Sequence, residues 1–303
     1  MKNRVCAVIV TYNRLEKLKK TLLAYEKQTE KPYSIIIFDN NSNDGTVKYL
    51  QSWKERNKEI FDIDLYFNDK NEGGAGGFNK ALGYALHKDC DWIWISDDDA
   101  YPEPNAFECL DRRLNLVNSD VGAVCSTVIQ GGQIAPRHRR RIRASAFTGI
   151  KEICIGDEEY KNETFDLNLY TFVGTCLRKT VLSEVGLPNK EYFIWYDDTE
   201  HSMRVNHNYK IVCDPQIVVV HDVPAPRKEK TWKGYYANRN RLDAYSNHIS
   251  EKQFKKYLKF FKMQIILAYF IDKRTYKVKK QALYDFKNKF MGISDIYKPG
   301  SRI

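Results

Sequence analysis

Short β-branched, apolar segments alternate with segments of helical periodicity through the first 128 residues of this 303-residue chain. The spacing predicts strands at 5–10, 34–38, 62–67, 91–96 and 121–128, and helices at 14–27, 46–56, 78–87 and 105–117. Strands separated by single helices form βαβ units with parallel strands. We therefore expect an α/β fold with a mostly parallel, doubly wound, Rossmann-like central sheet flanked by helices.

Polar residues follow four of the expected strands at the point where each strand ends. The clusters lie at residues 11–13, 39–41, 68–77 and 97–99. Doubly wound sheets bind their ligands beyond the carboxyl ends of the strands. Four polar clusters on one edge of the sheet therefore predict a binding site there.

Three adjacent aspartates, Asp97, Asp98 and Asp99, follow the expected strand at 91–96. Their carboxylates repel one another, and a divalent cation such as Mg²⁺ or Mn²⁺ would offset that repulsion. Alternate side chains of an extended segment point the same way, so Asp97 and Asp99 could share an ion while Asp98 faces elsewhere. Alternatively, the three form a solvated acidic loop.

A glycine-rich segment, NEGGAGGF at 71–78, precedes the expected helix at 78–87. Its glycines would let the backbone approach a ligand, and a helix N-terminus favours anionic groups. The segment is neither a Walker A loop nor GxGxxG. The alternative interpretation is a flexible tight turn.

Further along, an aromatic run leads into Asp197, Asp198 and Glu200. A carboxylate beside an aromatic wall can act as a general base, although acids also favour a helix N-terminus for electrostatic reasons alone. His221 ends an apolar strand, as either a structural histidine or a third metal ligand. Arg239, in an expected helix, either binds phosphate or packs in the interior.

Together these segments resemble glycosyltransferase family 2, the inverting enzymes of the GT-A fold. The matching segments are AVIVTYNR (7–14), IIIFDNNSNDGT (35–46), NEGGAGGFNKAL (71–82), ISDDDAYPEP (95–104), FIWYDDTE (193–200) and the strand that ends at 221. The glycine segment, the triple aspartate and the acidic segment look most like galactofuranosyltransferases and related rhamnosyltransferases. A departure is Tyr196, which stands between Trp195 and the acids.

The resemblance implies a GT-A domain at 1–245 and a basic amphipathic helical extension at 246–303. It implies that Asp198 is the general base, that Asp197 and Glu200 orient the acceptor, and that Asp97, Asp99 and His221 hold Mn²⁺ or Mg²⁺. The residues that it assigns to the nucleotide-sugar donor are Thr11, Asp39, Asn41, Asn71, Gly74, Ala75, Gly76, Gly77, Lys80, Asp98, Trp195 and Arg239. Among these, Asp39 would accept the imide N–H of the base.

The activity implied is metal-dependent transfer of one galactofuranose, with inversion, from UDP-galactofuranose to a hydroxyl of a glycan acceptor in surface polysaccharide synthesis. The acceptor would be lipid-linked. Without the long terminal domains of polymerising relatives, we expect single-sugar transfer. The alternative on the same scaffold is rhamnosyl transfer from dTDP-rhamnose.

The net charge of +10 lies entirely in residues 251–303, which hold 14 Lys and Arg against 4 Asp and Glu. Because residues 1–250 are neutral, we expect no nucleic-acid partner; a non-catalytic nucleic-acid or membrane-binding protein is the remote alternative. The expected helix at 252–271 carries an apolar stripe of Phe254, Leu258, Phe261, Ile265 and Ala268 among lysines. That stripe would contact an anionic membrane, form an oligomer interface or pack as an ordinary extension.

Two features bear on location. Seven scattered cysteines without a CxxC predict reduced thiols, and no apolar run reaches 18 residues. We therefore expect a cytoplasmic protein, with peripheral binding at the inner face of the membrane as one alternative. The arginine-rich segment at 137–143 is expected to belong to a mobile loop at 129–145, which would clamp a diphosphate of the acceptor or be simply solvated.

Overall fold

The structure is a computed structural model that describes residues 3–223 and 232–301. Its centre is a ten-stranded sheet in the order β10-β13-β6-β12-β4-β1-β2-β3, with β5 on β13 and β7 on β6. The strands are β1 (Val5–Thr11), β2 (Ser34–Asp39), β3 (Asp62–Phe67), β4 (Trp92–Asp97), β5 (Ala100–Pro102), β6 (Val121–Gln130), β7 (Gln133–Ile134), β10 (Phe165–Leu167), β12 (Thr175–Arg178) and β13 (Lys210–His221).

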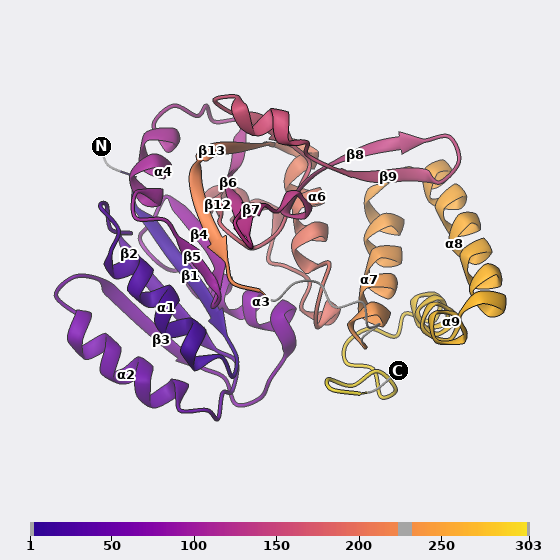
Figure 1. The fold of residues 1–303 in the computed structure, drawn as a ribbon, viewed down its shortest axis with the longest axis horizontal. Helices are drawn as coiled ribbons and strands as arrows, with labels where there is room; N and C mark the ends of the chain where they lie inside the picture. The colour runs from indigo at the N-terminus through magenta and orange to yellow at the C-terminus, as the bar shows by residue number, and fades with distance from the viewer. Residues whose placement is uncertain (1–2, 224–231, 302–303) are drawn as a thin grey trace.

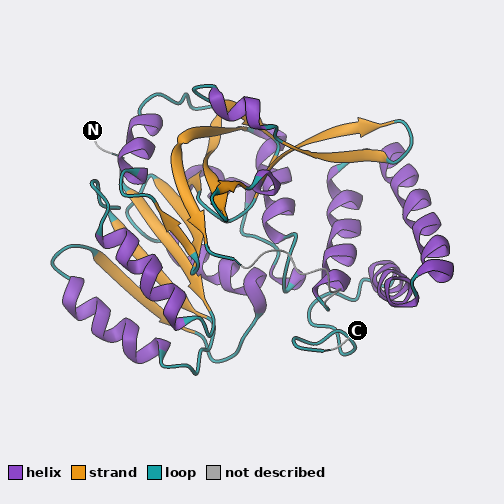
Figure 2. Cartoon of the chain, in the orientation of Figure 1, coloured by secondary structure: helices purple, strands orange, loops and turns teal. Residues whose placement is uncertain are grey.

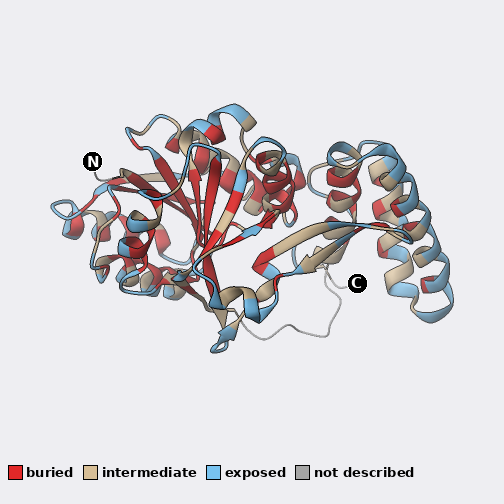
Figure 3. Cartoon of the chain, turned by 90° about the horizontal axis from the view of Figure 1, so that it is seen from above, coloured by how far each residue is buried: buried red, intermediate tan, exposed pale blue. Residues whose placement is uncertain are grey.

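The half of the sheet that sequence periodicity predicted is parallel. β4, β1, β2 and β3 pair in parallel register, as do β6 and β13, while β12 runs antiparallel between β4 and β6. The connections carry α1 (Leu15–Glu26), α2 (Thr46–Asn57), α3 (Gly73–Ala85) and α4 (Ala106–Leu114). Helices cover both faces of the sheet (Figures 1 and 2), and buried residues concentrate in the strands between them (Figure 3). The expected α/β architecture is confirmed.

The topology brings the triple aspartate beside the end of β13. Parallel strands β1, β2 and β4 end at Thr11, Asp39 and Asp97, on one edge of the sheet. The chain turns after β4 into β5, which pairs antiparallel with β13 so that Ala100 lies opposite His221. Backbone pairing therefore fixes the aspartates next to a histidine more than 120 residues later in the chain.

The glycine segment differs from its expected form, because α3 begins at Gly73 and includes all four glycines. A Cβ on Gly77 would lie 2.7 Å from Cγ1 of Val10 in β1, and one on Gly73, at φ +73°, would lie 2.0 Å from the carbonyl oxygen of Phe193. The missing side chains thus let the first turn of the helix approach β1 and the 193–196 segment.

The prediction of a mobile loop at 129–145 is wrong, because most of this segment forms strands and a short helix. After β7 and the short 3₁₀-helix η1 (Pro136–His138), β8 (Arg139–Ser145) pairs with β9 (Gly149–Cys154) and β11 (Leu169–Tyr170). Arg139 is buried and donates to the carbonyls of Ser126, Val173 and Gly174. Tertiary partners for the arginines, which sequence periodicity does not show, stabilise this hairpin.

β13 is one long strand with an irregularity between Cys213 and Val218. β11 and β12 are separate short strands. The remaining elements of this region are η2 (Asp157–Lys161), α5 (Lys179–Val185), η3 (Lys190–Tyr192) and α6 (Asp197–Asn208).

Three helices follow: α7 (Lys233–His248), α8 (Glu251–Ile271) and α9 (Lys273–Lys287). The β8–β9 hairpin extends from the main body to α8 (Figure 1). Phe261 of the expected apolar stripe is buried in a cluster with α7 side chains, Phe254, Leu258 and Ile265 pack against that cluster, and Ala268 is also buried. This stripe therefore packs inside the protein. Within the described residues, no helix is both long and apolar enough to span a bilayer.

Candidate active site

A cleft of about 790 Å³ lies along the carboxyl edge of the sheet. Its walls come from the ends of β1 and β4, the start of α3, the β8 region, residues 193–199 and the first turns of α7. The expected site residues that line it are Thr11, Asn71, Gly74, Asp97, Asp98, Trp195, Asp197, Asp198 and His221. Residues separated by more than 200 positions in the chain thus share one cavity.

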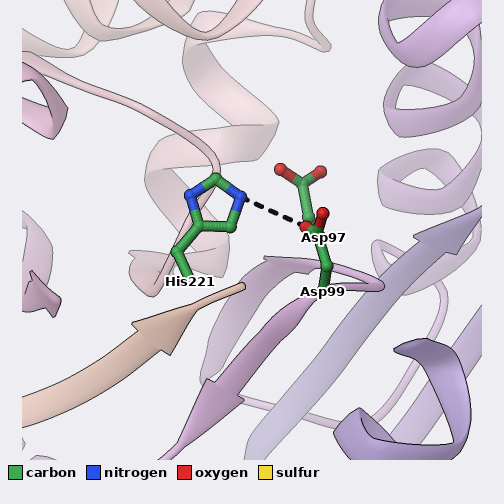
Figure 4. A group of neighbouring side chains, drawn as sticks. All are labelled: Asp97, Asp99 and His221. Atoms are coloured by element: carbon green, nitrogen blue, oxygen red, sulfur yellow. Dashed lines mark hydrogen bonds and ion pairs between the residues drawn. The ribbon is translucent and has the colours of Figure 1, made fainter. Parts of the chain in front are cut away.

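Asp97, Asp99 and His221 form a compact group on one side of the cleft (Figure 4). One ligand atom of each lies within 4.8 Å of the others, and His221 Nε2 is 3.1 Å from Asp99 Oδ1. Burial and the nearby Asp99 raise the pKa of Asp97 to about 7. Two carboxylates and an imidazole whose donor atoms converge this closely suit a divalent cation such as Mn²⁺ or Mg²⁺.

A hydrogen-bond network holds the ring of His221 in place. Gln130 Nε2 lies 2.9 Å from His221 Nδ1 and 2.9 Å from His138 Nε2, and His138 Nδ1 lies 2.6 Å from Thr171 Oγ1. A contact to Nδ1 leaves Nε2 directed at the aspartates. Hydrogen bonds of this kind set the ring orientation of metal-binding histidines.

The central aspartate of the triplet has a different environment. Asp98 accepts a hydrogen bond from Thr11 Oγ1 at 2.8 Å and pairs with Arg14 at 3.2 Å. Burial raises its pKa to about 6, and Arg14 opposes that rise. Asp98 therefore ties β4 to β1 at the floor of the cleft. Arg14 lines the cleft too and was missed by sequence reasoning, although it belongs to a matching segment.

Asp39 is buried at the end of β2 and is not among the residues that line the cleft. Its Oδ2 accepts the N–H of Ser42 at 3.0 Å, whereas its Oδ1 is buried without a hydrogen-bond partner among the described residues. The neighbouring Asn41 is exposed, with φ 72°. A buried carboxylate oxygen without a donor is costly, so the arrangement suits a ligand N–H.

Asn40, which sequence reasoning missed, organises the glycine segment. Its amide donates to Asn71 Oδ1 and to the carbonyl oxygen of Gly73, and its Oδ1 accepts the N–H of Glu72. A polar residue directly after a strand in this cluster was the available signal. Asn40 thereby connects the end of β2 to the start of α3.

The start of α3 contributes less to the cleft than expected. A Cβ at Gly74 would meet nothing within 4 Å, so this position is open to a ligand. Ala75, Gly76 and Gly77 are buried and do not line the cleft. Lys80 does not line it either: its ammonium pairs with Glu72 at 2.5 Å.

Asp197 and Asp198, which also line the cleft, open α6. Burial and Asp198 raise the pKa of Asp197 to about 8. Burial also raises the pKa of Asp198, but Arg140 and hydrogen bonds from Thr199 oppose the rise. Of the two carboxyls, Asp198 is the one whose ionised form is favoured by a neighbouring cation and by two hydrogen bonds from Thr199. Asp198 is the better proton acceptor of the two.

Glu200 lies one turn into α6 and does not line the cleft. Its carboxylate pairs with His248 at 2.7 Å and with Arg204 at 2.9 Å. Burial alone would raise the pKa of Glu200, but His248 and Arg204 lower it below the ordinary value. In this structure Glu200 connects α6 to α7.

The backbone before α6 is strained and externally supported. Phe193, Trp195 and Tyr196 all have positive φ, a conformation that non-glycine residues hold only when their surroundings enforce it. Asn240 Nδ2, from α7, lies within 3.1 Å of the carbonyl oxygens of Tyr192, Ile194 and Trp195. These bonds present Trp195, which is 47% exposed, and the two aspartates to the cleft.

Arg239 has a related role and does not line the cleft. It is 1% exposed, and its guanidinium donates to the carbonyl oxygens of Gly292, Glu191 and Tyr192. With its donors directed at backbone, Arg239 braces the segment that leads to Asp197. Arg239 is therefore not among the donor-binding residues of the function proposed below.

Basic side chains also line the cleft, and sequence reasoning had singled out the arginines at 137–143 but not Lys233 or Arg241. Arg140 pairs with Glu152 and donates to Thr199 Oγ1 at 2.7 Å. Lys233 and Arg241, from α7, line the cleft, as does Arg137. The arginine cluster at 137–143 was the available signal in the sequence. Arg140 lies at the cleft because its segment forms β8, which pairs with β9. Positive charge beside the acidic groups suits a phosphorylated ligand.

Known proteins with similar sequences are glycosyltransferases. Residues 6–186 match the family model of glycosyl transferase family 2. Over 205 residues the chain is 39% identical to galactofuranosyltransferase GlfT1 of Mycolicibacterium smegmatis, an alignment that covers 66% of this chain and 65% of that protein. It is 24% identical to dTDP-rhamnosyl transferase RfbF of Shigella flexneri over 74% of this chain and 70% of that protein.

Solved structures share the fold. Staphylococcal (S. aureus) TarS 1–349 in complex with UDP-GlcNAc aligns with a TM-score of 0.63 at 14% identity, over 94% of this chain and 80% of that one. Mannosyltransferase PcManGT from Pyrobaculum calidifontis, in complex with GDP-Man and Mn²⁺, aligns with a TM-score of 0.59 at 17% identity, over 95% and 76%. The expected GT-A fold is confirmed, and the family-model match shows that the chain belongs to glycosyl transferase family 2.

Proposed function

We propose that the protein transfers a single galactofuranose, with inversion, from UDP-galactofuranose to a hydroxyl of a glycan acceptor. The observation that carries this proposal is the cleft that the Asp97–Asp99–His221 group shares with Asp197 and Asp198. The mycobacterial relative, 39% identical, is a galactofuranosyltransferase, although the alignment spans only 65% of that protein.

The two acidic groups have different chemical roles in this proposal. Bound by Asp97, Asp99 and His221, Mn²⁺ or Mg²⁺ would act as a Lewis acid toward the leaving diphosphate, and the imidazole nitrogen favours Mn²⁺. Asp198 takes the proton of the acceptor hydroxyl as that oxygen forms its bond to the anomeric carbon. A single displacement with the base on the face opposite the leaving group inverts the configuration. Asp197, protonated beside Asp198, can donate a hydrogen bond to the acceptor.

The donor end of the cleft favours a pyrimidine nucleotide. The unpartnered Oδ1 of Asp39 can accept the imide N–H that uracil and thymine both carry. We assign donor contacts to Thr11, Asn71, Gly74, Asp98 and Trp195 as well, because they line the cleft. The more distant Asn41, Ala75, Gly76, Gly77 and Lys80 would shape this end of the cleft from behind.

The donor assignment can be tested by measuring nucleotide release. Purified protein, Mn²⁺ and a synthetic galactofuranoside acceptor are incubated in turn with UDP-galactofuranose, UDP-galactopyranose, dTDP-rhamnose and GDP-mannose. We expect release of UDP with UDP-galactofuranose alone. Turnover of dTDP-rhamnose instead would establish the alternative function, which the similarity to the rhamnosyl transferase of Shigella flexneri favours.

The pH dependence of kcat provides a second test. Because burial raises the pKa values of Asp197 and Asp198, the base gains its charge at a higher pH than an ordinary aspartate. We expect kcat to fall as the pH is lowered, with a midpoint above the ordinary aspartate range near 4. Arg140 lowers the pKa of Asp198, so Arg140→Gln should move this midpoint to higher pH. An unchanged midpoint in a folded Arg140→Gln protein would contradict the assignment.

We propose further that the acceptor is lipid-linked and that the enzyme works in the cytoplasm, at the inner face of the membrane. The free state of all seven cysteines suits a reducing compartment. The wall formed by Arg137, Arg140 and Arg241 suits an acceptor that carries phosphate. A higher kcat/KM for a polyprenyl-diphosphate-linked acceptor than for its phosphate-free analogue would support this assignment.

A further inference from the structure

The last turns of α8 expose apolar side chains that no other part of the described chain covers. Residues 263–271 carry no charge. Phe270 is 78% exposed and Ile271 is 81% exposed, and Ile266 and Leu267 are also more than half exposed. These four residues lie outside the buried stripe that packs on α7 and α9, so they form a second apolar face on the same helix.

This face continues into a groove between α8 and α9. The groove has a volume of about 460 Å³, and its apolar lining includes Ile266, Tyr269, Phe270 and Tyr276. Lys262 and Lys280 flank it. The exposed end of α8 and this groove together are called the α8 tip here.

Positive charge surrounds the α8 tip. The segment 273–280 holds five basic residues, and four of them, Lys273, Arg274, Lys277 and Lys280, are exposed. Lys279 turns inward to Gln264. The single acid between residues 263 and 280 is Asp272, which caps the N-terminus of α9. Apolar side chains at a helix end and neighbouring exposed cations are the two signals that hold a protein on an anionic bilayer.

We propose that the α8 tip docks on an anionic phospholipid membrane, with Phe270 and Ile271 in the interfacial region and the four exposed cations at the headgroups. Charge favours this occupant over a second copy of the chain, because two copies joined through this face would bring two such cation clusters together. The proposal does not depend on the donor or on the catalytic assignment. It gives a place for a lipid-linked acceptor, since α7 both packs on α9 and lines the cleft.

Point variants test the α8 tip better than removal of residues 251–303, because α8 and α9 bury side chains against α7 and β9. The full-length protein is floated with vesicles of phosphatidylcholine alone and of phosphatidylcholine mixed with phosphatidylglycerol. We expect binding to the mixed vesicles and at least about tenfold weaker binding to phosphatidylcholine. The variants Phe270→Ser/Ile271→Ser and Lys273→Glu/Arg274→Glu/Lys277→Glu should each lower binding to the mixed vesicles by about tenfold or more.

The matched control is Ile60→Ser/Leu116→Ser, which removes two apolar side chains that are 53% and 62% exposed. They follow α2 and α4, helices on the side of the molecule away from α8 (Figure 1). It should bind like the wild type. Absent binding to mixed vesicles, or undiminished binding by both α8-tip variants, would overturn the proposal. A wild-type dimer in sedimentation that Phe270→Ser/Ile271→Ser converts to a monomer, without vesicle binding, would assign the face to self-association instead.

Discussion

In the Asp198→Asn variant, kcat for sugar transfer should fall by roughly 10²- to 10⁴-fold, the range that a positioned general base contributes. The asparagine amide keeps the size of the side chain and an acceptor oxygen for Thr199, but it has no charge with which to take a proton. Asp198 is not part of the Asp97–Asp99–His221 group, so the affinity for the donor should stay close to the wild-type value. Single-turnover kinetics and calorimetric titration with UDP measure the two quantities separately.

Asp197→Asn is the matched control for this result. Because burial and Asp198 keep Asp197 protonated at neutral pH, its amide replacement preserves a neutral hydrogen-bonding group. A protonated Asp197 exerts no net charge on Asp198, so the acidic limb of the kcat profile should stay close to that of the wild type. A larger loss of kcat in Asp197→Asn than in Asp198→Asn would reverse the two roles. A loss of UDP affinity in Asp198→Asn would mean that this residue belongs to the donor side.

The sequence predicts the sheet and one edge of the site because both depend on local patterns. Short β-branched, apolar segments locate β1 to β4, period-3.6 signals locate their helices, and the parallel connection rule then places the strand ends together. Asp97, Asp98 and Thr11 were found because they stand directly after strands. Asp99 meets His221 because β5 pairs with β13, a long-range contact that periodicity does not predict. The family resemblance had grouped the two residues without that pairing.

The arginine-rich hairpin was missed for a different reason. Hydrophobic periodicity reveals a strand when its inward residues are apolar, but β8 begins with three arginines. Arg139 is nonetheless fully buried, because backbone carbonyls satisfy its donors, and Arg141 pairs with Glu159. Arg239 is a similar case, since a guanidinium bound to carbonyls has the same sequence signature as one that binds phosphate. In both cases the partners lie far away in the chain.

Removal of the metal should be as damaging as removal of the base. We expect EDTA to lower transfer by about 10³-fold and Mn²⁺ to restore it, because Lewis-acid stabilisation of a leaving diphosphate is worth several kcal/mol. Asp99→Asn and His221→Ala should lower transfer activity to the same extent, and added Mn²⁺ should not restore it. Both should also weaken Mn²⁺ binding, measured without donor by the loss of the free-ion signal in electron paramagnetic resonance.

Asp222→Asn is the control for the metal experiment, because Asp222 follows His221 directly but bonds to the hydroxyl of Tyr101 instead of joining the group. It should bind Mn²⁺ like the wild type. Full turnover in EDTA, or unchanged Mn²⁺ binding in Asp99→Asn, would separate the Asp97–Asp99–His221 group from catalysis. The reason to expect otherwise is electrostatic: without a cation, burial and Asp99 raise the pKa of Asp97 to about 7, whereas a bound divalent ion would allow both carboxylates to ionise.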